Sequence, residues 1–507
     1  MDKYLCSYSM HPHQLLVLTS RIRRLPEPIR DRYDHDIYIL QQDLSRHLGD
    51  NFGTRIDRLS QFQTSIVQQF KKSCHASENN VMLMKCIEYG DGITLQRIIS
   101  NGSTQNSTYP HLLLLMYASF LGRIDIIQLL LHSGCNVNTP SNFTHHEQFS
   151  ALCFATMNNQ IHAMRLLLSS GANLNHTSSG GITPLLIACR CGHTLAIFEI
   201  LSHPNVDVTY TDDTGCGVLN HSVQMIHNMK GDIRSMLLLL LYGAPLNPRI
   251  ADSTGRTPLH TACFGYQYDA SVLLVSFGAD TKMLSGDGFN IIDLLLCRDD
   301  RIDHSACRML THLLDVKPDL DMSSRNASGY TPAIIAIDML SVGTGEETFK
   351  FLCEHGADLS IGDRDEHRTV LHEVAELGLP EMVEKVLTSL SKIFVYSDLK
   401  DVNGYTPESI ARNQEARCAA QTGGGNLETR ARYLRIAERI HEFSRDVVIK
   451  NWRKQTQGGL HNWSHKRAHV GKSVTHNESP RAASMGRAQP GSHISVPYPG
   501  NINHNNL

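Results

Sequence analysis

The chain has 507 residues, of which 41% are apolar and 19% are charged, and both fractions lie within the range of globular proteins. Its 47 Lys and Arg residues nearly balance its 50 Asp and Glu residues, so the formal net charge is −3. This balance gives the whole chain no electrostatic attraction to nucleic acid or to an acidic membrane. The most apolar stretches, residues 111–120 and 235–242, are far shorter than the roughly 18 residues of a membrane span. We therefore expect neither nucleic-acid binding nor a membrane span.

The N-terminus and the cysteines both favour a protein of the cytoplasm or the nucleus. Residues 1–20 lack the basic start and the following apolar run of a secretory signal. The 13 cysteines are odd in number and lie mostly within apolar helical patterns, which is typical of buried, reduced thiols and not of a secreted disulfide framework. The sequence therefore predicts a protein that is not secreted.

Residues 1–78 contain no repeat and form the first predicted domain, a helical extension. One helix is expected over residues 30–47, after Pro28. We expect the helices of this domain to pack onto the first repeat and cover its apolar face, in a monomer. The alternative is a dimer held by a short coiled coil over residues 30–72, although sustained heptads are not evident. A second, amphipathic helix is indicated by apolar residues at steps of three and four, namely Ile56, Leu59, Phe62, Ile66 and Phe70.

Residues 252–280 show most completely the unit that repeats in the second predicted domain. Thr257-Pro258 opens a helix, because Thr suits the N-cap and Pro suits the first helical position. Small residues at 262–263 let two helices approach closely, and residues 272–274 are the apolar part of a second helix. Gly278 then supplies the left-handed conformation that ends this helix.

The same elements recur along residues 79–445. Thr-Pro pairs return at Thr183, Thr331 and Thr406. Ser150 and Thr369 take the same place without the proline, and Ser150 precedes Thr183 by 33 residues. These features predict about ten helix–turn–helix units, near residues 82–102, 111–138, 149–175, 182–208, 216–247, 256–281, 288–320, 329–359, 368–396 and 404–443.

With this period and the motifs T-P-L-H at residues 257–260 and T-V-L-H at residues 369–372, the chain resembles the ankyrin-repeat family. The resemblance implies an all-α solenoid, in which each unit is a helix–turn–helix with a β-turn finger and the array has a concave face that binds a partner. It also implies that His260 and His372 are structural, through hydrogen bonds that link turns and neighbouring repeats.

Residues 446–507 form the third predicted domain, a disordered basic tail. From residue 451 onward the segment is rich in Asn, His, Ser, Gly and Pro, and it holds seven basic residues against one acid. Such a composition cannot bury enough apolar surface to order itself. The favoured interpretation is a solvated tail. The alternative is an arm that docks through Trp452 and Trp463 or binds anions weakly.

No motif in the sequence indicates a catalytic, cofactor or metal site. Neither the phosphate-binding pattern G-x-x-x-x-G-K-[ST] nor a strand-flanked G-x-G-x-x-G occurs. Cys189 and Cys191 form a Cys-x-Cys pair, but no second Cys or His pair follows at the spacing of a zinc site. We therefore expect no enzyme activity, no cofactor and no bound metal.

The sequence and the resemblance together predict an adaptor or scaffold that binds a partner protein on the concave face. The alternative is the substrate-recognition subunit of a ubiquitin ligase, although no SOCS-box or F-box helices are evident. In the resembled family, partners touch the fingers and the ends of the first helices, where aromatic residues and arginine are the most effective contacts. The finger positions of this chain are Phe149, Ile182, Arg256, Tyr330, Arg368 and Tyr405. The first-helix positions are Met157, Arg190, Phe264, Asp338 and Glu376.

Overall fold

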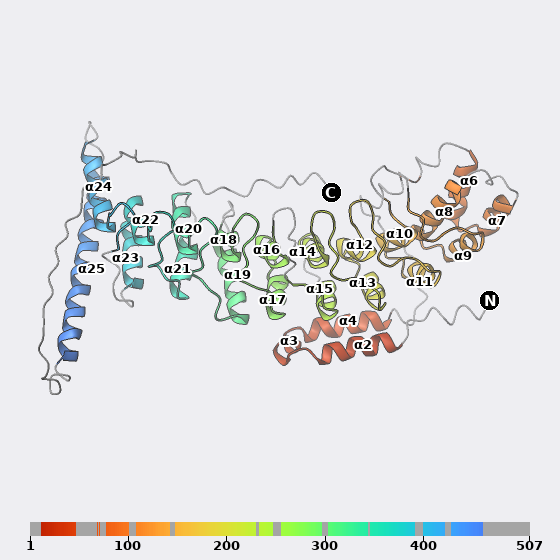
Figure 1. The fold of residues 1–507 in the computed structure, drawn as a ribbon, viewed down its shortest axis with the longest axis horizontal. Coiled ribbons are helices and arrows are strands. Elements are labelled where there is room, and N and C mark those ends of the chain that lie inside the picture. The colour runs from red at the N-terminus through yellow and green to blue at the C-terminus, as the bar shows by residue number, and fades with distance from the viewer. Residues whose placement is uncertain are drawn as a thin grey trace, which may run out of the picture. The chain divides into compact units, whose positions relative to one another are not determined.

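The computed structural model is helical, with no strand among the residues that it describes (Figure 1). These residues are 12–46, 68, 70, 78–100, 108–141, 148–229, 233–246, 255–296, 303–342, 345–390, 399–420 and 427–459. The chain divides into two compact bodies, of which the first holds residues 1–295 and 304–321 and the second holds residues 296–303 and 322–507. Each body contains a stack of helix pairs, so the predicted all-α solenoid fold is confirmed.

The described residues of the first body contain seven helix pairs, one for each of the first seven predicted units. The pairs are α6 (Glu78–Tyr89) with α7 (Gly92–Ser100), α8 (Thr108–Leu121) with α9 (Ile124–His132), α10 (Ala151–Met157) with α11 (Ile161–Ser169), α12 (Pro184–Cys191) with α13 (Thr194–Leu201), α14 (Val218–Met229) with α15 (Arg234–Leu241), α16 (Pro258–Phe264) with α17 (Tyr268–Ser276), and α18 (Ile291–Leu296) with α19 (Asp303–Val316). First helices contact first helices, as α10 does α8 and α12, and second helices contact second helices, as α13 does α11 and α15. Each pair thus buries its apolar face against its neighbours, which is how repeat arrays are stabilised.

The second body contains the last three predicted units. The first of them is α20 (Pro332–Asp338), the 3₁₀ turn η1 (Met339–Val342) and α21 (Glu346–Glu354). The next is α22 (Val370–Leu377) with α23 (Pro380–Leu390), and the last is α24 (Pro407–Ala420) with α25 (Leu427–Gly459). The first helices again follow one another, because α22 contacts both α20 and α24.

The threonines of the repeated motif cap the first helices, as the sequence predicted. The Thr183 hydroxyl accepts a hydrogen bond from the backbone N–H of Leu186 at 3.3 Å. At Thr257 the cap is reciprocal, because the His260 backbone N–H donates to the threonine hydroxyl at 3.3 Å and the Thr257 backbone N–H donates to Nδ1 of His260 at 3.4 Å. Nε2 of His260 lies 3.1 Å from the backbone oxygen of Met283. The Met283 oxygen belongs to the next finger, so the predicted structural role of His260 is confirmed.

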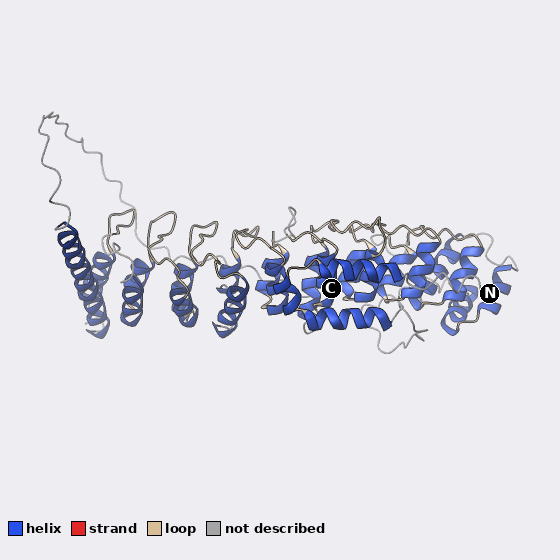
Figure 2. Cartoon of the chain, turned by 90° about the horizontal axis from the view of Figure 1, so that it is seen from below, coloured by secondary structure: helices blue, strands red, loops and turns tan. Residues whose placement is uncertain are grey.

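Fingers connect successive pairs, and their loops run along one side of the helices in each body (Figure 2). In the second body each finger begins with a side chain that accepts a hydrogen bond from the residue at the finger's end. Asn326 Oδ1 accepts from the Tyr330 N–H at 3.0 Å, and Asp363 Oδ1 accepts from the Arg368 N–H at 2.9 Å. Asp401 Oδ1 accepts from the Tyr405 N–H at 2.7 Å. These bonds hold the backbone of Tyr330, Arg368 and Tyr405, which are the finger residues that the sequence predicts as partner contacts.

Gly278 ends α17 in the left-handed conformation that the motif predicted, with a φ of +95°. We expect Gly278→Ala to lower the free energy of unfolding by about 1 kcal/mol, because a Cβ atom disfavours this conformation. Its Cβ would meet nothing within 4 Å, so the loss would come from the backbone alone. Gly92→Ala is the matched control, since Gly92 also has open space but no positive φ. Urea unfolding of the two variants checks this, and equal stabilities would contradict it.

The N-terminal helices depart from the sequence prediction in their number and in their position. The expected helix over residues 30–47 is divided by Tyr33 into α3 (Glu27–Arg32) and α4 (Asp34–Arg46), and α2 (Pro12–Arg23) precedes them. The predicted docking onto the first repeat is wrong for this hairpin, because α2 and α4 contact α15 of the fifth repeat. The sequence shows that the hairpin has an apolar face, but the partner of that face is distant in the chain.

The rest of the N-terminal extension is described only at residues 68 and 70. Phe70 is buried, and its ring centroid lies 5.0 Å from that of Tyr117 and 5.2 Å from that of Phe154, in the second and third repeats. The predicted helix over Ile56 to Ile66 lies outside the described residues. Within the alternative dimer seam over residues 30–72, Leu40 and Leu44 of α4 are buried in the same chain, which leaves them unavailable to a coiled coil.

The predicted tail begins later than residue 446, because α25 continues to Gly459. The sequence between Leu427 and Gln457 has neither Gly nor Pro, so nothing in it ends the helix earlier. Residues 460–507, including Trp463, lie outside the described residues.

Candidate partner-binding surface

Three of the six predicted contact residues in the first body are buried and cannot form a binding surface. Phe149 is 7% exposed and packs edge-on against the ring of Phe154, and Met157 is 2% exposed. Arg256 is 4% exposed, because its guanidinium stacks 4.0 Å from the ring centroid of Phe264 and lies 4.0 Å from a carboxylate oxygen of Asp287. The prediction is wrong for these residues. Their finger or helix end is covered by neighbouring residues of the same stack.

The remaining predicted residues of the first body, Ile182, Arg190 and Phe264, are half-buried. Phe264 is engaged from one side by the Arg256 guanidinium. Ile182 ends a finger whose Ser178 hydroxyl accepts from the Ile182 N–H at 3.2 Å. These three residues stay predictions of partner contact.

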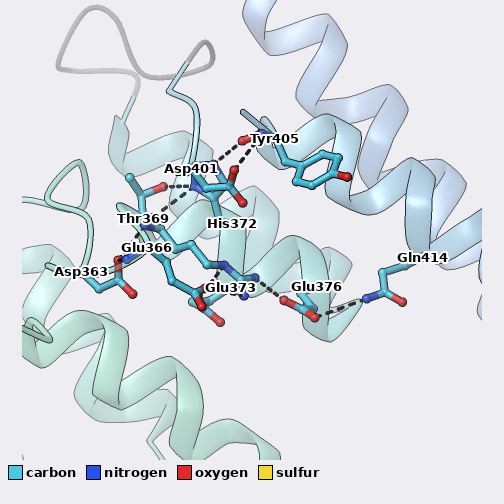
Figure 3. Close-up of polar contacts among 10 residues, drawn as sticks. Asp363, Glu366, Thr369, His372, Glu373, Glu376, Asp401, Tyr405 and Gln414 are labelled. Atoms are coloured by element: carbon cyan, nitrogen blue, oxygen red, sulfur yellow. Dashed lines mark hydrogen bonds and ion pairs between the residues drawn. The ribbon is translucent and has the colours of Figure 1, made fainter. Parts of the chain in front are cut away.

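The five predicted residues of the second body are Arg368 and four residues of its own and the two neighbouring units. Arg368 ends the finger that precedes α22, and Glu376 lies two turns into that helix. Tyr330 and Asp338 come from the preceding unit, and Tyr405 comes from the next one. Glu373 and Glu376, both labelled in Figure 3, form ion pairs with the Arg368 guanidinium. We call the set Tyr330, Asp338, Glu366, Arg368, Glu373, Glu376 and Tyr405 the Arg368 surface.

The guanidinium of Arg368 pairs with three glutamates. Its Nε lies 3.2 Å from Glu373 Oε1, and its Nη1 lies 3.7 Å from Glu366 Oε2. Its Nη2 donates to Glu376 Oε2. Gln414 of α24 donates to the other Glu376 oxygen at 3.4 Å, so the next unit also holds this carboxylate. The Arg368 side chain is only 14% exposed, so these ion pairs lie partly out of water.

Negative charge exceeds positive charge at this surface, and burial raises the pKa of two of its carboxyl groups. Burial raises the pKa of Glu373 to about 7; Arg368 opposes this shift, and the neighbouring carboxylates of Glu376, Asp363 and Asp338 add to it. Burial also raises the pKa of Asp338. A surface of this kind favours the approach of a cation, because a further positive charge would relieve repulsion among the carboxylates.

Exposed apolar side chains border the acidic groups. Tyr405 is 46% exposed and Val402, in the same finger, is 61% exposed. Leu377, at the end of α22, is 37% exposed. Aromatic and aliphatic groups beside charged ones are the usual composition of a protein-binding surface.

The sequence prediction missed Glu366 and Glu373, which the structure places against Arg368. Glu373 lies three residues before Glu376 on the same helix, so the two share a face. Helical spacing from Glu376 could therefore have identified Glu373. Glu366 carries no such signal, because its position depends on the path of the finger.

Metal-binding clusters and membrane-spanning helices are absent from the residues that the structure describes. No group of three or more His, Cys, Asp or Glu side chains that could hold a metal ion occurs there. No helix in this part of the chain is long and apolar enough to cross a membrane. Burial raises the pKa of Cys153 to about 11 and those of Cys189 and Cys263 to about 12, so these thiols stay protonated at neutral pH.

Comparison with known proteins supports the repeat assignment directly over part of the array. The family model of ankyrin repeats, three copies, matches residues 115–212. The palmitoyltransferases ZDHHC13 of Homo sapiens and Mus musculus are each 27% identical to the chain over 155 residues, which is 31% of this chain. The chain spans only 22% of the length of these relatives. The crystal structure of the human ASB11 ankyrin repeat domain aligns with 48% of this chain and 98% of that chain, at 20% identity and a TM-score of 0.37.

Proposed function

We propose that this chain, which is an ankyrin-repeat protein, is an adaptor that holds a partner protein on the Arg368 surface. Ankyrin repeats are protein–protein interaction modules, and the finger and first-helix positions are where the family resemblance expects contact. The observation that carries the proposal is that all five predicted contact residues of the second body, which come from three successive units, are half-buried or exposed. In the first body, half of the predicted set is buried.

The charge of the surface favours a partner that presents a basic side chain beside an apolar one. Glu366, Glu373 and Glu376 share the single cation of Arg368, and Asp338 adds to the negative potential. The exposed Arg364 and Asp365 at the finger tip offset each other in charge. A Lys or Arg side chain of the partner would bind between the glutamates, and the adjacent apolar side chain of the partner would pack on Tyr405 and Val402. Such charge complementarity selects the partner and speeds association.

The test is site-specific photo-crosslinking with the full chain. Tyr405 is replaced by a photoreactive phenylalanine analogue, and the same change at Tyr89 of the first body is the control, because Tyr89 is 82% exposed. We expect the Tyr405 position to crosslink a protein from a native extract at least tenfold more efficiently than the Tyr89 position. Glu376→Gln with Glu366→Gln should weaken that crosslink and its dependence on salt. Equal crosslinking from both tyrosine positions would place the contact elsewhere.

The alternative role, substrate-recognition subunit of a ubiquitin ligase, would use the same surface for its substrate. It differs in requiring a second, stable interaction with other ligase subunits. Purification of the full chain from its native source would distinguish the two roles, since only the alternative predicts that ligase subunits remain bound after the Glu366→Gln, Glu376→Gln change.

A further inference from the structure

The second helix of the fifth repeat, α15, is buried on every side. All of its residues from Ser235 to Leu241 are buried, and Met236 to Leu239 have no exposed surface. In an array, the second helix normally leaves one face in water, so it needs polar residues there. A helix that is apolar all round needs a cover on that remaining face.

The sequence of α15 shows which positions need the cover. A glycine ends the second helix of the second, third and fifth repeats, namely Gly134, Gly171 and Gly243. Six residues before it, the second and third repeats carry polar side chains and the fifth carries leucine: Gln128, Arg165 and Leu237. Two residues before it the same change occurs: His132, Ser169 and Leu241. Both leucines are buried, whereas His132 and Ser169 are exposed.

The cover is the N-terminal hairpin of α2, α3 and α4. Both α2 and α4 contact α15 and lie on the side opposite the first helices (Figure 1). The apolar face of the hairpin is fully used, since Leu18, Leu40 and Leu44 are at most 1% exposed. The opposite face carries Leu16 and Tyr38, which are 65% and 55% exposed. The hairpin therefore has a defined binding face and a free face.

Polar contacts hold the hairpin at both ends of α15. At the first residue of the helix, Arg234 forms an ion pair with Asp43. At the last residue, Arg21 Nη1 donates to the backbone oxygen of Leu241 at 2.9 Å, and the guanidinium lies 4.4 Å from the centroid of the Tyr242 ring. A cation at the C-terminal end of a helix is favoured by the helix dipole. These contacts fix the register of the hairpin along α15.

Tyr33, which lies between α3 and α4, is 5% exposed, so the bend of the hairpin is buried as well. Burial raises the pKa of Tyr33 to about 12.

The hairpin is joined to the array by a long connection. Its last helix ends at Arg46, and Phe70 packs on the second and third repeats, so 23 residues lie between them. A connection of this length can reach up to roughly 80 Å, which is about four times the length of α4. The ion pair at Arg234 is also partly in water, with side chains 29% and 39% exposed.

We propose that the hairpin of residues 12–46 and the outer face of α15 are a tethered ligand and its binding site, and that two copies of the chain dimerise by exchanging hairpins. In one chain the tether gives the hairpin a high effective concentration at its own site, so the closed monomer prevails at low concentration. Exchange replaces every closed contact with the same contact from the second copy. This interaction is separate from the Arg368 surface and does not depend on it.

The test mixes two full-length variants that are each defective in one half of the pair. The first carries Leu18→Asp and Leu40→Asp, which disable the hairpin. The second carries Leu237→Gln and Leu241→His, the residues that the second repeat has at these positions. Light scattering after size exclusion should show a one-to-one heterodimer in the mixture, at concentrations where wild type is a monomer. Adding Arg234→Asp to the first variant should weaken the heterodimer at least tenfold, and adding Asp43→Arg to the second should restore it.

Two controls keep the result unambiguous. Leu16→Asp lies on the free face of α2, so this variant should behave as wild type. Circular dichroism reports whether each variant folds. If the second variant does not fold, a labelled peptide of residues 12–46 replaces it and should bind the first variant at least tenfold more tightly than it binds wild type. Two folded variants that remain monomers when mixed, or a peptide that binds both chains equally, would overturn the proposal.

Discussion

Replacing Arg368 with Met should destabilise the second body by about 3 kcal/mol at pH 8. Removal of one partner from a buried ion pair costs about 3–5 kcal/mol, because the other charge is left uncompensated. Here Glu373 and Glu376 would both lose their cation, while the slight exposure of the arginine gives some relief through water. Met keeps the apolar stem of the side chain, so the variant removes the charge with little loss of packing. Hydrogen exchange of peptides from α20 and α22 measures the local free energy of opening.

Arg412→Met is the matched control for this change. Arg412 is 53% exposed and pairs with Glu408 four residues earlier in α24. An exposed pair of this kind contributes about 0.5 kcal/mol or less. If Arg368→Met lowered the local free energy of opening no more than Arg412→Met does, water would screen the charges around Arg368 fully, and the ion pairs of this cluster would not stabilise the fold.

The local parts of this fold could be predicted because each rests on a few neighbouring residues. Thr257 caps its helix and Gly278 ends the next one through contacts within one repeat. The same reasoning located the helix pairs that carry this local chemistry, and the repeat period located the others, such as α18 with α19. The family resemblance predicted the structural role of His372, whose Nε2 lies 3.2 Å from the Tyr405 oxygen of the following finger.

The exposure of individual contact residues could not be predicted in this way. Arg256 and Arg368 occupy equivalent finger positions, yet Arg256 is buried under Phe264 and Arg368 is held by glutamates. Their different surroundings come from residues of the following helix, Phe264 in one repeat and Glu373 or Glu376 in the other. A motif that aligns the fingers contains no information about these neighbours.

The docking site of the N-terminal hairpin could not be predicted from the repeat motif, because the two contacting segments are far apart in the sequence. Arg21 and Leu241 are 220 residues apart in sequence. The signal that could have found their contact is the unbroken run of leucines in α15, which leaves no polar face for water. Such a run indicates that a cover exists, whereas the identity of the cover depends on matching Asp43 to Arg234.

Replacing Glu373 with Gln should stabilise α22 more at pH 8 than at pH 5. The pKa of Glu373 rises from its ordinary value of 4.5 to about 7 in the folded chain, so the folded state binds more protons than the unfolded state between these values. Stability from this group is therefore complete below pH 4.5 and is lost as the pH rises toward 7. Each pKa unit corresponds to 1.36 kcal/mol, which sets a limit of about 3 kcal/mol, and we expect a gain of about 2 kcal/mol at pH 8.

The measurement is hydrogen exchange of α22 peptides at pH 5 and pH 8, compared between wild type and Glu373→Gln so that shared effects cancel. One such shared effect comes from His372. Burial lowers the pKa of His372, so this residue reduces the stability of the fold as the pH falls below 6.5.

Glu346→Gln is a control for which the expected change in stability at pH 8 has the opposite sign. Hydrogen bonds from Lys385 and Lys350 lower the pKa of Glu346, so its contribution is present above pH 4.5 and lost below it. That variant should lose a little stability at pH 8, because Glu346 is largely exposed and its ion pairs are screened. If Glu373→Gln lost stability at pH 8 as well, the Glu373 carboxylate would be a favourable partner of Arg368, and the acidic excess of this surface would not repel a further negative charge.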